Sequence, residues 1–204
     1  MGASKFFQYS YIFFAILGYG VKSKNMLLCN GKIHNPHLIG HLKCMLNIKI
    51  ICVGKLKERF YIDAVAEYSK RLGGYCKAEI IEVPEYRLPE RPSDSQILHA
   101  LEKESDLIVD ALLPNAKTIA MCVEGREVSS QELAKLLTDF AKYGTSKLNF
   151  IIGGSFGLHE GLKKKADMTL SMSKMTFPHT LARVMLLEQL YRSFKIAEGG
   201  KYHK

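Results

Sequence analysis

Residues Phe150 to Glu160 read FIIGGSFGLHE, an apolar segment followed by a turn with three glycines and the start of a helix. A strand that leads through glycines into a helix is typical of α/β proteins, so this stretch indicates the fold class. Within it, residues 153–157 (GGSFG) fit the G-x-S-x-G pattern of a hydrolase nucleophile elbow. Either Ser155 is a nucleophile, or the backbone of this turn is shaped to hold a ligand.

Strand-like and helical segments alternate on both sides of this turn. Strands are predicted at 46–54, 78–83, 118–123, 147–152 and 168–172, and helices at 58–72, 93–112, 129–143, 158–165 and 178–197. Ser93 or Asp94 is a natural N-cap for the second helix, and Ser129 with Glu132 forms a capping box for the third. The alternation predicts an α/β fold with a mainly parallel sheet that is covered by helices on both faces.

Three loops leave the carboxyl ends of predicted strands, where parallel sheets bind their ligands. They comprise residues 123–126, 153–157 and 171–179. Because the carboxyl ends of parallel strands share one edge of the sheet, we expect these loops to meet around a single cleft.

Composition and charge are those of an ordinary globular protein. Hydrophobic residues make up 47% and charged residues 24% of the chain, and the formal net charge is +9. Residues 1–44 carry five lysines and no acid, which leaves 24 basic and 20 acidic side chains, or +4, for residues 45–204. A mild positive charge permits contacts with RNA phosphates without requiring them. The five cysteines are dispersed and form no CxxC pair, which predicts a reduced, cytoplasmic protein with no metal site.

Residues 1–44 do not continue the alternating pattern. Residues 6–21 (FFQYSYIFFAILGYGV) partly resemble a secretory signal, but they lack its cleavage chemistry and fall short of the ~20 apolar residues that span a bilayer. The residues up to Cys44 show no helical or strand period. We interpret 1–44 as a non-native or unstructured extension, with the natural protein beginning at or near Met45. A membrane anchor or targeting segment is the alternative.

A serine hydrolase is one reading of the glycine turn. Ser155 would need an acid and a histidine later in the chain, and Asp167 with His179, or Glu188 with His203, have that order. However, the HGGG oxyanion motif is absent, and the domain is small for an α/β-hydrolase. The Rossmann pattern G-x-G-x-x-G and the phosphate-binding pattern GK[ST] are absent as well.

A ligand that approaches the backbone closely is the other reading, because glycines leave space where a Cβ would collide. The apolar or thioether side chains expected around it are Met121, Ile151, Ile152, Leu170, Met172, Met175 and Phe177. A flat aromatic base with a cationic, phosphate-free tail suits this lining, as in S-adenosylmethionine. The plain alternative is that the glycines only turn the chain.

Three motifs resemble the RlmH family, the 23S rRNA pseudouridine N3-methyltransferases of the SPOUT class. They are IIGGSFGL at 151–158, SMSKMTFPHTLARVMLLEQLYRSFKI at 171–196 and the terminal YHK at 202–204, and the resemblance extends from about residue 46 to 204. It implies a SPOUT methyltransferase domain at 45–204 with a C-terminal trefoil knot, a homodimer and S-adenosylmethionine as the cofactor. The implied substrate is the helix 69 region of 23S rRNA in the assembled ribosome. The final helix, apolar nearly all round, agrees with packing on the core and on a second subunit.

The resemblance also implies site residues. By motif, the cofactor-binding positions are Met121, Gly153, Met172, Ser173, Lys174, Met175, Thr176 and Phe177. Tyr202 and His203 are the candidates to contact the base or remove its N3 proton, in a tail that completes the site of the other subunit. Arg183 is a further catalytic candidate that would meet a phosphate or the cofactor carboxylate, with simple solvation as the alternative.

Several roles stay open on sequence alone. His179 suits either a structural role in the first helical turn or contact with the substrate, and Lys163-Lys164-Lys165 suits a solvated face, with contact to an RNA phosphate as the alternative. A SPOUT methyltransferase of another RNA site, a non-catalytic RNA-binding protein and a serine hydrolase using Ser155 are the competing functions. No membrane partner is expected for residues 45–204.

Overall fold

The computed structural model describes residues 27–29, 32–34 and 46–199, which belong to two separate units. In the first unit, β1 (Leu27–Cys29) and β2 (Lys32–His34) pair as antiparallel strands. The sequence predicts no regular element there, and for these residues that prediction is wrong.

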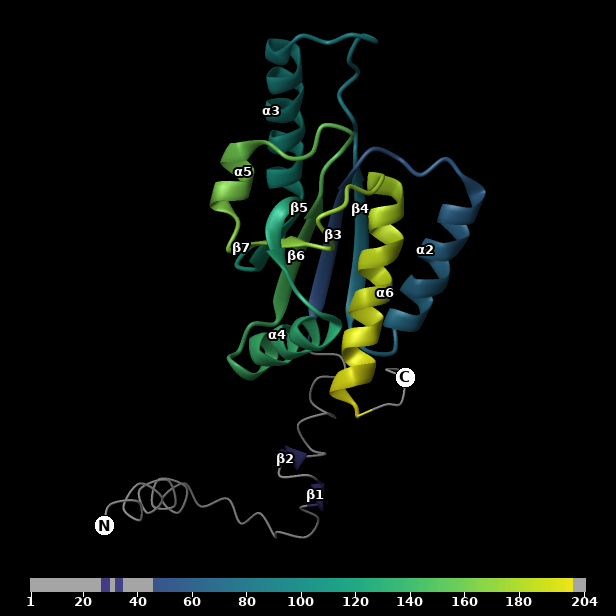
Figure 1. Cartoon of the computed structure of the whole chain (residues 1–204), viewed down its shortest axis with the longest axis vertical. Coiled ribbons are helices and arrows are strands. Elements are labelled where there is room, and N and C mark those ends of the chain that lie inside the picture. The colour runs from purple at the N-terminus through teal and green to yellow at the C-terminus, as the bar shows by residue number, and fades with distance from the viewer. Residues whose placement is uncertain (1–26, 30–31, 35–45, 200–204) are drawn as a thin grey trace, which may run out of the picture. The chain divides into compact units, whose positions relative to one another are not determined.

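Five strands form one fully parallel sheet in the second unit (Figure 1). They are β3 (Asn47–Val53), β4 (Lys77–Val83), β5 (Lys117–Glu127), β6 (Lys147–Ile152) and β7 (Met168–Ser171). The order across the sheet is β4-β3-β6-β5-β7, and every neighbouring pair is parallel. The predicted α/β class with a parallel sheet is therefore confirmed, and β6, which leads into the glycine turn, is the central strand.

Helices cover both faces of this sheet (Figure 1). They are α2 (Arg59–Leu72), α3 (Asp94–Ala111), α4 (Ser130–Lys142), α5 (Glu160–Lys165) and α6 (His179–Ala197). Helix α6 packs between α2 and α4, and these three cover one face, while α3 and α5 cover the other. No helix within residues 46–199 is long and apolar enough to cross a bilayer.

Alternating side chains of the central strands build the two halves of the core. Ile50 of β3 and Phe150 of β6 point to the face under α2, α4 and α6, whereas Ile51 and Ile151 point to the opposite face. All four are at most 1% exposed. Strands that are buried on both faces read as continuous apolar runs, which explains the sequences of β3 and β6.

Asn149 is a buried polar exception within β6, and it fixes the chain before β5. Its side chain accepts a hydrogen bond from the Leu113 amide at 3.0 Å and donates to the Leu113 carbonyl at 3.3 Å. These contacts satisfy a side chain that is fully buried, where an unpaired amide would be costly. They hold the segment that links α3 to β5.

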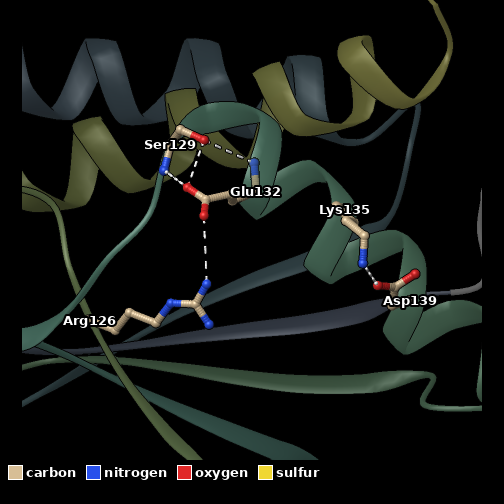
Figure 2. Close-up of polar contacts among 5 residues, drawn as sticks. All are labelled: Arg126, Ser129, Glu132, Lys135 and Asp139. Atoms are coloured by element: carbon tan, nitrogen blue, oxygen red, sulfur yellow. Dashed lines mark hydrogen bonds and ion pairs between the residues drawn. The ribbon is translucent and has the colours of Figure 1, made fainter.

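The predicted capping box starts α4 (Figure 2). The Ser129 amide donates to Glu132 Oε2 at 2.8 Å, and the Glu132 amide donates to Ser129 Oγ at 3.2 Å. The hydrogen bonds from Ser129 keep the pKa of Glu132 below its ordinary value. Arg126 reaches the other carboxylate oxygen at 3.6 Å and ties the end of β5 to this helix.

Strand β5 is longer than its sequence predicts. The predicted strand ends at residue 123, but the strand runs to Glu127 with an irregularity after Met121. Met121 and Arg126 both pair with Leu170, so the four residues between them bulge from the ladder. A Cβ at Gly125 would lie 2.6 Å from the Leu170 carbonyl carbon, so only glycine allows this close approach. The predicted loop at 123–126 is thus corrected to a bulged part of β5.

Candidate functional site

A cleft of about 710 Å³ opens at the carboxyl edge of the sheet, over the ends of β5, β6 and β7. Its walls come mainly from residues 121–124, 152–158, 170–173 and 175–179. They include parts of all three segments that were predicted as strand-end loops, of which 123–126 is the bulged part of β5, so the expectation that these segments meet around one cleft is confirmed. The volume lies within the range of roughly 300–1,000 Å³ that is usual for small-molecule sites.

The glycine turn folds tightly on itself at the floor of this cleft. The Gly157 amide donates to the Gly154 carbonyl at 3.1 Å, and Gly153 is buried beneath them. A Cβ at Gly153 would overlap the Gly157 carbonyl oxygen and lie 2.5 Å from its carbon. Gly157 itself has a φ of +82°, a conformation that favours glycine. The turn therefore needs these glycines for its own shape, and that shape exposes backbone to a ligand.

Among residues 46–199, Ser155 belongs to no hydrolase triad, and His203 of the other nominated triad lies outside the described residues. Its hydroxyl donates to Glu85 Oε1 at 3.1 Å. Asp167, the acid proposed with His179, instead accepts hydrogen bonds from Lys117 Nζ at 2.6 Å and from the Thr118 amide at 2.8 Å. Those partners lie at the start of β5, the opposite end of the strand from the cleft. The triad of Ser155, His179 and Asp167 is therefore contradicted.

The loop after β7 closes the cleft from the other side, and side-chain hydrogen bonds shape it. The Ser171 hydroxyl donates to the Ser173 carbonyl at 2.8 Å, and the Met175 amide donates to the Ser173 hydroxyl at 3.0 Å. The predicted cofactor residues that line the cleft are Met121, Gly153, Met172, Ser173, Met175, Thr176 and Phe177. Lys174 is exposed and is not among the lining residues.

Arg183 differs from its prediction. Its guanidinium is 1% exposed and donates from Nη1 to Glu82 Oε1 at 2.8 Å. Nη2 donates to the Val53 carbonyl at 2.6 Å and to the Gly54 carbonyl at 2.8 Å. Arg183 therefore binds the carbonyl groups where β3 ends and pairs with a carboxylate of β4. It is neither a phosphate or cofactor ligand nor a solvated side chain, so both expectations were wrong.

His179 begins α6 and is half-buried at the wall of the cleft. Burial and then the nearby Arg183 charge lower the pKa of its imidazole below the ordinary value. His179 Nε2 and Glu85 Oε2 each lie 3.6 Å from the position that a Gly54 Cβ would occupy. A neutral imidazole beside a carboxylate is able to accept a hydrogen bond from a ligand. The position favours the substrate role of the two that the sequence left open, and that role stays a prediction.

Three lining residues of the cleft carry charge or thiol chemistry, and sequence reasoning did not predict their contacts. Lys163 of α5 pairs with both Glu124 and Glu160, so it is not part of a solvated face. Its ammonium group holds the pKa of Glu124 below the ordinary value. Cys122 lines the same wall, and burial followed by the Glu124 charge raises the pKa of its thiol. No periodic signal marks Glu124 or Lys163, because their contact joins segments 39 residues apart.

Tyr202 and His203 lie outside the residues that the structure describes, so their predicted catalytic roles stay predictions. Within residues 46–199, no group of three or more His, Cys, Asp and Glu side chains is arranged to hold a metal ion.

Known proteins are similar to this sequence over nearly the whole second unit. The family described as "Predicted SPOUT methyltransferase" matches residues 46–203. A "Ribosomal RNA large subunit methyltransferase H 1" from Clostridium perfringens is 47% identical over 159 residues, which cover 78% of this chain and 100% of the relative. A "Ribosomal RNA large subunit methyltransferase H" from Bifidobacterium adolescentis is 48% identical over the same shares of the two chains. The chain belongs to the RlmH family of SPOUT methyltransferases.

A solved structure agrees with this family at the level of the fold. The "Probable Methyltransferase" from Bordetella pertussis Tohama I superposes with a TM-score of 0.50 at 14% identity and covers 78% of this chain and 99% of its own. In this chain, seven of the predicted cofactor residues line the cleft at the carboxyl edge of the sheet.

Proposed function

We propose that this protein is a methyltransferase of large-subunit ribosomal RNA that takes its methyl group from S-adenosylmethionine. The observation that carries the proposal is the cleft, in which seven of the eight cofactor residues expected from the RlmH motifs line one cavity. Membership of the RlmH family, whose relatives are named as rRNA large subunit methyltransferases, supports the reaction and the substrate class.

The cleft fits the proposed cofactor in shape and chemistry. Met121, Met172 and Phe177 give it apolar walls that suit an adenine ring. The glycine turn offers bare backbone, since a Cβ at Gly153 would fill the turn. S-adenosylmethionine supplies an electrophilic methyl group, so no metal is needed for transfer.

The residues of the chain then have two tasks, namely to orient the acceptor base and to receive its proton. We place the acceptor at the mouth of the cleft next to His179, whose neutral imidazole can accept a hydrogen bond from the base. Tyr202 and His203 are proposed to contact N3 of a pseudouridine from the tail of the other subunit. The proposed acceptor lies in the helix 69 region of 23S rRNA, in the assembled ribosome.

A homodimer is part of the proposal, and a surface on α6 supports it. A groove of about 440 Å³ runs beside this helix, and its apolar lining includes Val184, Met185, Leu133 and Val128. Grooves of this kind suit packing against a second subunit. We further propose the C-terminal trefoil knot of the SPOUT class, a cytoplasmic location, and a methyltransferase domain that spans residues 45–204.

The test is methyl transfer to ribosomes from cells that lack this methylation, with the methyl group of S-adenosylmethionine labelled. We expect label in large-subunit RNA, with less transfer to free 23S rRNA than to ribosomes. Cofactor binding without transfer to any ribosomal RNA would instead favour another RNA substrate. A protein that neither binds the cofactor nor transfers methyl would contradict the proposal.

A further inference from the structure

A second cleft of about 850 Å³ adjoins the first and has no role in the function described so far. It lies at the carboxyl ends of β3 and β4, on the other side of the glycine turn. Ser155 and Phe156 line both clefts, so the turn is the wall they share. A substrate that reaches the first cleft from this side must pass over Phe156.

Three exposed cationic side chains line the second cleft. Lys55 and Lys57 follow β3, and Arg87 follows β4. All three are exposed, and none of them forms an ion pair with another of the residues 46–199. Unpaired cations grouped at one opening are able to bind phosphate groups, because no internal carboxylate competes for them.

Two carboxylates of the same cleft are already engaged, and one of them is buried. Glu104 is 6% exposed and accepts a hydrogen bond from the Tyr86 amide at 2.9 Å. Glu85 accepts the Ser155 hydroxyl at the shared wall. Such oxygens suit the N–H groups on the edge of a nucleobase and would repel a phosphate. Among exposed lining residues, the three cations outnumber the carboxylates of Glu58 and Glu85.

Exposed aromatic rings complete the lining. Phe156 is 50% exposed at the shared wall, and Tyr86 is 43% exposed, with its ring edge-on to His99. A large apolar ring held half-exposed on a rigid glycine turn is a surface on which a base can stack. The second cleft is thus lined by cations, carboxylates and aromatic rings together.

We infer that the second cleft binds the RNA strand next to the acceptor nucleotide, with Lys55, Lys57 and Arg87 on its phosphates and a base stacked on Phe156. This inference rests on the proposed function, because it names the path by which the RNA reaches the methyl group. It assigns RNA recognition to the ends of β3 and β4, apart from the cofactor cleft.

The test compares two triple variants of the full chain. Lys55→Gln with Lys57→Gln and Arg87→Gln removes the cations of the second cleft. Lys70→Gln with Lys77→Gln and Lys142→Gln removes the same charge from exposed positions near the amino edge of the sheet. Methyl transfer to unmethylated ribosomes is followed over a series of salt concentrations, and S-adenosylmethionine affinity is measured by calorimetry.

For the cleft variant we expect KM for ribosomes to rise at least about tenfold, with kcat and cofactor affinity unchanged. Each phosphate contact with a single strand contributes about 0.7 to the slope of log affinity against log salt, so losing three should reduce that slope by about 2. The control variant should keep the wild-type slope. An unchanged KM and slope in the cleft variant, or an equal change in the control, would overturn the inference while leaving the proposed function intact. No transfer by the wild-type protein would overturn both.

A single substitution tests the stacking contact separately. Phe156→Ala should raise KM for ribosomes about tenfold, and Phe156→Tyr should restore it, since stacking needs only an aromatic face. Cofactor affinity should not change in either variant. A loss of cofactor affinity that accounts for the whole effect would assign Phe156 to the cofactor cleft and overturn this part of the inference.

Discussion

Replacing Gly153 by alanine should weaken the cofactor site, although the substitution itself removes no polar group. The added Cβ would overlap the Gly157 carbonyl oxygen and lie 2.5 Å from the carbonyl carbon, where ordinary contact begins at 3.4 Å. The turn must therefore open by about 1 Å, and the atoms that block it are backbone atoms that cannot rotate away. Overpacking of this kind costs about 1–3 kcal/mol of folding stability.

The effect on the cofactor follows from the same displacement. An opening of about 1 Å breaks the hydrogen bond of 3.1 Å from the Gly157 amide to the Gly154 carbonyl and moves the floor of the cleft. We expect the dissociation constant for S-adenosylmethionine, measured by calorimetry, to rise at least about tenfold, or 1.4 kcal/mol. Urea unfolding would show whether the variant remains folded at the assay temperature.

Gly144→Ala is the matched control. Gly144 also has a φ of +82°, nothing lies within 4 Å of its added Cβ, and it follows α4, outside the cleft. This variant should lose about 1–2 kcal/mol of stability from backbone strain alone and keep wild-type cofactor affinity. A folded Gly153→Ala protein that binds the cofactor as tightly as the wild type would refute the reasoning about the turn.

Three further changes test other parts of the structure. Arg183→Met should lower the free energy of unfolding by about 2–4 kcal/mol, because the Val53 and Gly54 carbonyls lose their buried donor and the partly exposed Glu82 carboxylate loses its partner; urea denaturation would measure it, and a loss below 1 kcal/mol would contradict the structural role. Since the pKa of His179 is lowered in the folded protein, folding opposes its protonation, and the free energy of unfolding should fall as pH drops below the ordinary pKa of 6.5 toward the lower folded value. The variant His179→Gln should therefore flatten the dependence of Tm on pH in this window. A profile identical to that of the wild type would show that another group titrates. Deleting residues 202–204 should abolish methyl transfer while sparing cofactor affinity, and unchanged turnover would reject a catalytic role for the tail.

Most strands and helices were predictable because apolar runs, capping residues and glycines mark them within a few neighbouring residues. Residues 147–152 are mostly apolar and end in three consecutive apolar residues, which indicates a strand buried on both faces, and β6 has these same bounds. The capping box of Ser129 and Glu132 fixed the start of α4 to the residue. Likewise, glycines in a strand-to-helix turn indicated a close backbone approach, and the structure shows where that approach occurs.

What sequence reasoning missed depends on contacts between distant segments. Arg183 sits on an α-helix that is apolar nearly all round, and only the fold reveals that it reaches the carbonyl groups at the end of β3, 130 residues away. The bulge in β5 depends on the backbone of Leu170 in another strand. Glu85 lies in a proline-rich loop that has no helical or strand periodicity. No local pattern therefore predicted that it contacts Ser155 at the wall shared by the two clefts.

Locating the methyl group is the measurement that tests the central claim most directly. Ribosomes from cells that lack this methylation would be incubated with the protein and S-adenosylmethionine, and nucleoside and fragment mass spectrometry would identify the modified nucleotide. We expect one new methyl group at N3 of a pseudouridine in the helix 69 region of 23S rRNA, and less of it with the Gly153→Ala variant at a cofactor concentration that does not saturate the site. A methyl group only in another RNA, or none at all with the wild-type protein, would contradict the proposed function.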